Sequence, residues 1–164
     1  MKGLIASIII LGLAGMVVGV AVQGATTDIV TATVTPQTVS VSVDVSSVDY
    51  GVLDVNETSA PSVVITATNE GNVAEKLEIK GSDSADWTLS NTAIGSETFM
   101  HEFATDDDSY AAYTALHNTN YTTLDASVSA PSGTQLFKLQ LKMPSSTSAT
   151  GQQSTTVTVL ATEA

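Results

Sequence analysis

The stretch that decides the fold is residues 61–80, PSVVITATNEGNVAEKLEIK. Apolar side chains alternate with other residues on both sides of its centre, at Val63, Ile65, Ala67, Val73, Leu77 and Ile79. The central Asn-Glu-Gly-Asn of residues 69–72 combines residue types that tolerate turn and left-handed geometry. The pattern predicts a β-hairpin with one apolar and one wet face. Glu75 is polar at an inward position, so we expect a bulge or a rim position there.

Other segments repeat this alternation with period two. We expect strands at residues 39–45, at 50–53, around Trp87 and Leu89, at 99–103 and at 136–143, with a last one through Val157 and Val159. Phe99, His101 and Phe103 should share one face, and Phe137, Leu139, Leu141 and Met143 should point inward opposite Lys138, Gln140 and Lys142. Residues 110–120 are the one stretch after the leader that could hold a helical turn. These segments predict an all-β protein, a single antiparallel Ig-like or jelly-roll-like β-sandwich of about eight strands.

The N-terminus has the pattern of an export signal. Residues 4–22 are apolar or small without interruption and follow Lys2, which is typical of a secretory signal cleaved after Ala21 or Gly24. The run is also long enough to cross a bilayer, so an uncleaved anchor stays open. We therefore expect a signal peptide or hydrophobic N-terminal helix at 1–24, an extended linker or donor strand at 25–37 and the sandwich at 38–164.

Composition narrows the classes of partner. The 164 residues include five lysines, no arginine and seventeen acids, for a formal net charge of −12. This charge repels phosphate and anionic headgroups, so we expect no nucleic-acid partner, and membrane contact only through the N-terminal segment. The absence of cysteine excludes disulfides and thiolate metal sites. Abundant Ser and Thr suit an extracellular or cell-surface protein, which is where we place the chain.

No set of residues predicts an enzyme. His101-Glu102 lacks the second histidine of a metalloprotease helix, His101 has the parity of a packed strand residue, and no nucleophile motif is present. We expect no cofactor, although Asp106, Asp107 and Asp108, with Asp83 or Asp86, could offer oxygens to Ca²⁺. Their order is not that of a calcium loop, so a solvated acidic turn is the alternative. Asn56 and Asn120 begin glycosylation sequons.

Three resemblances follow from these residues. The chain resembles a group of uncharacterised secreted proteins of uncultured small-genome bacteria. Three elements carry this resemblance, namely Tyr50-Gly51-Val52-Leu53, the 69–72 turn and Trp87-Thr88-Leu89. That resemblance implies a secreted Ig-like surface protein. The leader followed by strands and the Asn-x-Gly turn is more loosely similar to the TasA and camelysin-like fibre proteins, which polymerise by lending an N-terminal strand to a neighbour. Lys2-Gly3 before a long apolar run resembles the leaders of archaeal type IV pilins and archaellins.

Three classes of function are compatible with these features. The first is a secreted structural protein, such as a filament subunit that associates with itself or with other surface proteins. Residues 26–34 would then add a strand to a neighbour's sheet edge, with Ile29 or Val34 anchored in a pocket. The second is an adhesion module for carbohydrate or protein, for which Tyr110, Tyr113 and Tyr121 are the candidates. The third is a hydrolase, which needs two convergent carboxylates.

Overall fold

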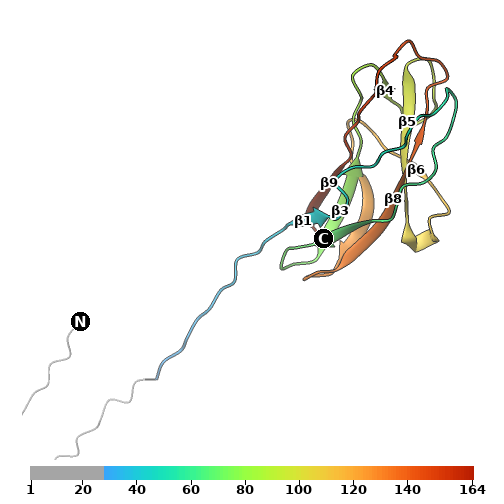
Figure 1. Cartoon of the computed structure of the whole chain (residues 1–164). Helices are drawn as coiled ribbons and strands as arrows, with labels where there is room; N and C mark the ends of the chain where they lie inside the picture. Colours follow the sequence, from blue (N-terminus) through green and yellow to red (C-terminus); the bar gives the residue numbers. More distant parts are fainter. Residues whose placement is uncertain (1–27) are drawn as a thin grey trace, which may run out of the picture. The chain divides into compact units, whose positions relative to one another are not determined.

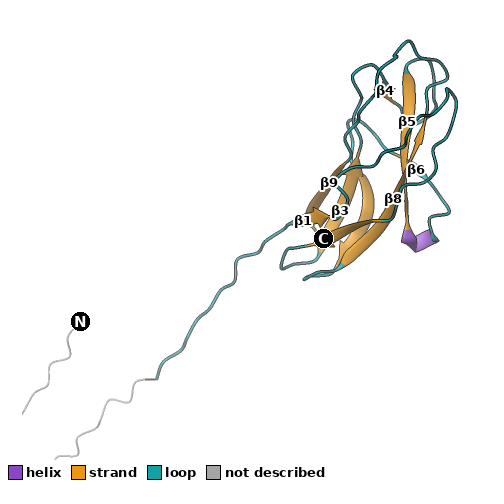
Figure 2. Ribbon diagram, in the orientation of Figure 1, coloured by secondary structure: helices purple, strands orange, loops and turns teal. Residues whose placement is uncertain are grey.

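A computed structural model describes residues 28–164, and Thr35–Ala164 form a compact unit. Nine strands and a single-turn 3₁₀ helix, η1 (Asp106–Asp108), make up its regular structure (Figures 1 and 2). Within the described residues no helix has the length and apolar character needed to span a bilayer. The hydrophobic run at residues 4–22, and with it the predicted signal peptide, anchor or pilin-like helix, lies outside the described residues.

The first sheet contains six strands, and β8 and β5 lie at its centre. Its order is β1 (Val41–Val43), β2 (Ile65–Asn69), β8 (Thr134–Lys142), β5 (Thr98–Thr105) and β4 (Thr88–Leu89), with β6 (Thr114–Ala115) also paired to β5. The β4–β5 pair is parallel, and the other pairs are antiparallel. The prediction for residues 136–143 is confirmed, because Phe137, Leu139 and Leu141 are buried while the alternate side chains are half-buried.

The second sheet contains three antiparallel strands in the order β7 (Thr122–Val128), β3 (Glu75–Lys80) and β9 (Thr158–Glu163). Leu77 and Ile79 of β3 are fully buried and belong to one core cluster with Phe99, Phe103 and Phe137 of the first sheet. The two sheets therefore share a core, and the predicted all-β sandwich is confirmed.

The predicted hairpin at residues 61–80 is wrong. β2 pairs with β1 and β8 in the first sheet, whereas β3 pairs with β7 and β9 in the second, so the turn at 69–72 is a corner between sheets. Asn69 makes this corner possible: its buried Nδ2 donates to the carbonyls of Val73 and Val128 at 2.8 and 3.0 Å. Apolar and polar side chains alternate in both strands because both strands face the same core. This alternation does not specify which strand lies beside each of them in the sheet.

Val63 differs from expectation, whereas Glu75 meets one of its two expected alternatives, the bulge. Val63 is 67 % exposed, so the inward face of β2 begins only at Ile65. Glu75 lies beside an irregularity in the register between β3 and β7, as a bulge would require, but it is fully buried and does not lie at the rim. The expected face of β3 is otherwise correct.

Other local predictions are also wrong. The strand expected at 39–45 shortens to β1, an edge strand whose Val43 is exposed. Residues 50–53 form no strand, although Tyr50 and Leu53 pack against the core. The helical turn expected at 110–120 lies earlier, at η1, and residues 114–115 form β6 instead. By contrast, the prediction that Trp87 and Leu89 pack inward is confirmed.

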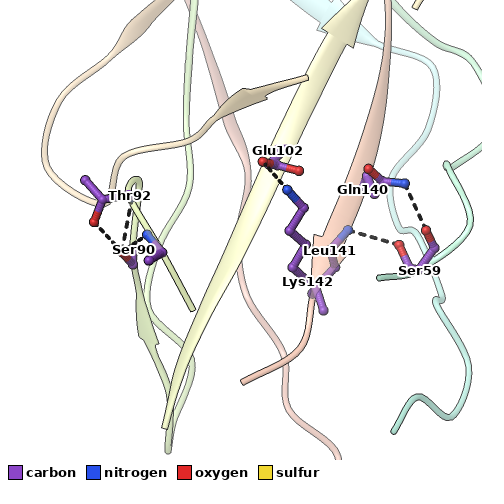
Figure 3. Close-up of polar contacts among 8 residues, drawn as sticks. Ser59, Ser90, Thr92, Glu102, Gln140, Leu141 and Lys142 are labelled. Carbon is purple, nitrogen blue, oxygen red and sulfur yellow. Dashed lines mark hydrogen bonds and ion pairs between the residues drawn. The ribbon is translucent and has the colours of Figure 1, made fainter. Parts of the chain in front are cut away.

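Residues 57–62 continue the edge of the first sheet beside β8 without forming a regular strand. Ser59 Oγ accepts the Leu141 N–H at 3.0 Å, and the Ser59 carbonyl accepts the Gln140 amide at 3.0 Å (Figure 3). On the other side of β8, the ammonium of Lys142 lies 2.9 Å from the carboxylate of Glu102 on β5 (Figure 3). These contacts supply β8 with polar partners on both sides.

Candidate functional site

A cleft of about 1150 Å³ opens into the sandwich. Four apolar side chains on the inner face of the first sheet line it, namely Ile65, Phe137, Leu139 and Leu141. Val157 and Val159, before and within β9, line it from the second sheet. The cleft therefore reaches the hydrophobic core of the domain.

Two non-strand segments also line the cleft, residues 45–53 and residues 149–156. Neither segment makes a backbone-to-backbone hydrogen bond within the part of the chain that the structure describes. Buried backbone groups normally have partners, and edge groups without partners invite pairing with another chain. The cleft thus combines an apolar floor with main-chain groups that have no backbone partner, although the N–H groups of Gly51, Ala149 and Thr156 donate to side chains.

The 45–53 segment is held to the sandwich by a buried polar contact. Tyr50 Oη lies 2.8 Å from Nε2 of His101 on β5, and the two rings meet nearly edge-on, with centroids 5.7 Å apart. His101 is 3 % exposed, and its Nδ1 has no hydrogen-bond partner among the described residues. The histidine is a packed strand residue, as its parity indicated.

Burial sets the protonation state of both partners. Desolvation lowers the pKa of His101 from 6.5 to about 4, so the imidazole is neutral at pH 7. Desolvation, with a smaller effect of Tyr113, raises the pKa of Tyr50 above its ordinary value. The contact is therefore a neutral hydrogen bond, and together with the packing of Val45, Val48 and Leu53 on the core it holds the 45–53 segment in place. The second histidine, His117, is half-buried and lies 3.4 Å from the Asn91 amide.

The acidic residues considered for calcium do not converge in the part of the chain that is described. Asp106 accepts the Gln135 amide at 2.8 Å, and Asp108 accepts the backbone N–H groups of Ala111 and Ala112 at 3.2 and 3.0 Å. Asp83 instead accepts the N–H of Leu89 on β4, and Asp86 accepts the Gln153 amide, at 2.7 Å each. No group of three or more potential metal-ligating side chains occurs among residues 28–164.

Both predicted glycosylation asparagines are exposed. Asn56 lies in a turn with a positive φ of 63°, and its Nδ2 is 3.3 Å from the Ser145 carbonyl. Asn120 lies in the loop before β7. Glycosylation at either position stays a prediction.

The three tyrosines proposed for an adhesive face do not gather on one surface. The ring of Tyr110 lies 4.5 Å from the Lys138 ammonium on β8, and that of Tyr121 lies 4.8 Å from the Lys80 ammonium on β3. These lysines point outward from opposite sheets, so the two rings lie on opposite faces of the sandwich. Tyr113 precedes β6 at the edge of the first sheet.

The predicted assembly residues lie in a segment without regular structure. Residues 28–34, called the arm below, form no strand, and Ile29, Val30 and Val34 are 86, 92 and 91 % exposed. The structure thus leaves three large apolar side chains in the arm without cover.

Sequence reasoning missed both the cleft and the Tyr50–His101 contact. The two residues are 51 positions apart, and no local pattern connects them. The signal that came nearest was the inward parity of His101 between two phenylalanines.

Comparison with protein-family models finds no match to this chain, and comparison with curated proteins finds none either. The three resemblances drawn from the sequence therefore stay predictions.

Proposed function

We propose that this chain is a non-enzymatic secreted or cell-surface structural protein that assembles into a filament through its arm. The observation that carries the proposal is the exposure of Ile29, Val30 and Val34 in a chain whose domain has an open apolar cleft. The export-type N-terminus and the acidic composition support a place outside the cell.

The arm has the pattern of a strand that needs a partner. Val30, Ala32 and Val34 occupy alternate positions, and Thr31 and Thr33 lie between them. In an extended chain the first set shares one face, and Thr31 and Thr33 share the other face with Ile29. The arm can therefore present an apolar face to a groove while its threonines face outward.

The cleft suits such a strand better than a small molecule. Its volume of about 1150 Å³ exceeds the roughly 300–1,000 Å³ of typical small-molecule pockets. A strand lying along it would give hydrogen-bond partners to main-chain groups of residues 45–53 and 149–156, and its apolar face would cover Val52 and Val55, which are exposed at the cleft. Strand addition of this kind takes affinity from main-chain bonds and specificity from alternate side chains.

The occupant in this proposal is the arm of a second copy. Burying each exposed valine contributes about 1.5–3 kcal/mol, whereas association costs at least about 4 kcal/mol in lost freedom. Arm docking alone is therefore modest, and contacts between neighbouring domains must add to it. Because the donor and acceptor surfaces differ, the assembly is head-to-tail, and it yields an open fibre when the rotation between copies does not close a ring.

The test places two charges on one face of the arm. Val30→Asp with Val34→Asp should leave a folded monomer that forms no fibres in negative-stain microscopy. The matched control is Thr31→Asp with Thr33→Asp, which adds the same charge to the other face and should still form fibres. Equal behaviour of the two variants, or a wild-type protein that stays monomeric at high concentration, would refute the proposal.

Deleting residues 26–35 is a second test. The deletion should give a folded protein that cannot polymerise but can still accept the arm of a wild-type copy. In a mixture it should therefore cap growing fibres and shorten them as its fraction rises. Unchanged fibre lengths would count against the cleft as the acceptor.

A further inference from the structure

The corner between β2 and β3 holds the chain just after the point where the arm ends. Asn72 makes three of the contacts: its Oδ1 accepts the Thr38 N–H at 2.8 Å, its Nδ2 donates to the Pro36 carbonyl at 2.8 Å, and its own N–H donates to the Thr38 carbonyl at 3.1 Å. One side chain thus pairs with the backbone on both sides of Gln37, as a neighbouring strand would.

Two glutamates of the same corner hold the next residues. Glu75 Oε1 accepts the Ser40 N–H at 2.7 Å, and the Glu70 N–H donates to the Ser40 carbonyl at 2.7 Å. The Glu70 carboxylate also accepts the Ser42 hydroxyl at 2.9 Å. We call Glu70, Asn72 and Glu75 together the clamp.

Gly71 shows how closely the clamp and the chain approach each other. A Cβ atom at this position would overlap both the Thr38 carbonyl oxygen and Glu75 Oε1. The corner therefore needs a glycine for space, and the clamped chain has no room to shift toward it. The first clamped group is the Pro36 carbonyl, and the proline ring itself fixes φ near −65°.

The length of chain between the clamp and the arm is the decisive quantity. Thr35 is the one residue between Val34, at the end of the arm, and Pro36, at the clamp. A single residue spans at most about 3.6 Å. A docked arm and a clamped Pro36 therefore leave no flexible linker, and the donor domain must lie directly against the acceptor.

We propose that the clamp is a positioning device that sets the angle between successive copies of the chain and makes the fibre stiff. The inference rests on the proposed function, because it names what fixes the geometry of the same assembly. With the clamp intact, each junction has one geometry, and the fibre has a regular twist. With the clamp released, residues 35–40 become a flexible linker, and the same docked arms connect domains that swing.

The main test compares Asn72→Ala with Asn91→Ala, an exposed asparagine whose amide makes one long contact of 3.4 Å. Asn72→Ala should still polymerise, because its arm and cleft are unchanged, but its fibres should show a several-fold shorter persistence length and a broader spread of twist. Amide exchange of Thr38 in its monomer should quicken about tenfold, as expected for one lost hydrogen bond. Asn91→Ala fibres should match the wild type.

A second variant keeps the clamp and lengthens the linker. Inserting Gly-Ser-Gly-Ser between Thr35 and Pro36 leaves every clamp bond in place, and it should also give flexible fibres. If both variants form fibres as stiff and regular as the wild type, the inference is overturned while the proposed function stands. If the wild-type chain forms no fibres, the proposed function fails and the inference fails with it.

Discussion

Tyr50 Oη and His101 Nε2 lie 2.8 Å apart inside the sandwich and connect the 45–53 segment to β5. The segment has no backbone-to-backbone hydrogen bond in the described part of the chain, so this side-chain bond and the packing of Val45, Val48 and Leu53 on the core hold it in place. The remaining imidazole nitrogen, Nδ1, is buried without a partner. The contact is stable only while the histidine stays neutral, since a buried imidazolium would lack both solvent and a counter-charge.

We therefore expect stability to fall as the pH falls from about 6.5 to about 4. The folded-state pKa of His101 is about 4 and its ordinary value is 6.5, so the unfolded chain binds more protons in this window. The free energy of unfolding should decrease by an amount on the order of 3 kcal/mol across it. Urea titrations of the wild type and His101→Gln should diverge there. Parallel pH profiles for the two proteins would contradict the burial argument.

Tyr50→Phe should lower the free energy of unfolding by about 1–3 kcal/mol, because it removes the hydroxyl and leaves His101 Nε2 unpaired in the interior. The matched control is Tyr121→Phe, whose ring lies at the surface under Lys80 and which should change stability by less than about 0.5 kcal/mol. Chemical denaturation measures both. If Tyr50→Phe left the free energy of unfolding unchanged, a water molecule would have to replace the hydroxyl as the partner of His101.

Leu139→Ala should cost about 2–5 kcal/mol, because its buried side chain lies on the inner face of β8. The neighbouring outward residue is not a silent control, since the Gln140 amide donates to the Ser59 carbonyl. Gln140→Ala should cost about 0.5–1.5 kcal/mol, the net value of one hydrogen bond. Thermal melts that rank the two in the opposite order would mean that β8 has been assigned the wrong face.

Gly71→Ala should destabilise the domain by about 1–3 kcal/mol, because the added methyl group overlaps the Thr38 carbonyl and the Glu75 carboxylate. Gly151→Ala is the control, since nothing lies within 4 Å of its added Cβ. That variant should stay within about 0.5 kcal/mol of the wild type. Comparable melting temperatures for the two variants would show that the corner can relax.

The sequence predicted the strands in which one face lies on the core and the other does not, because apolar and polar residues then alternate regularly. β8 alternates strictly because one of its faces lies on the core, so its inward residues Phe137, Leu139 and Leu141 could be named in advance. The pairing of β2 and β3 could not, because both alternate toward the same core from different sheets. A turn sequence such as that of residues 69–72 serves a hairpin and a corner equally well.

The candidate site was less predictable than the fold. The arm could be singled out because its apolar residues have no place in a regular core pattern. The cleft and the clamp depend on long-range contacts, such as that between Asn72 and Pro36, 36 residues apart. Asparagine and glycine at a turn satisfy local backbone preferences, so their sequence gives no sign of a second partner.

The arrangement of the second sheet has a consequence for the order of folding. Its central strand β3 pairs with β9 from Glu75↔Glu163 to Lys80↔Thr158, so the hydrogen bonds along one of its two edges wait for residues far along the chain. A nascent chain cannot close the sandwich until residue 163 is available, and non-local pairing of this kind is slow, in the range of about milliseconds to seconds. For a chain exported as we propose, the second sheet is completed only after β9 has left the translocation pore.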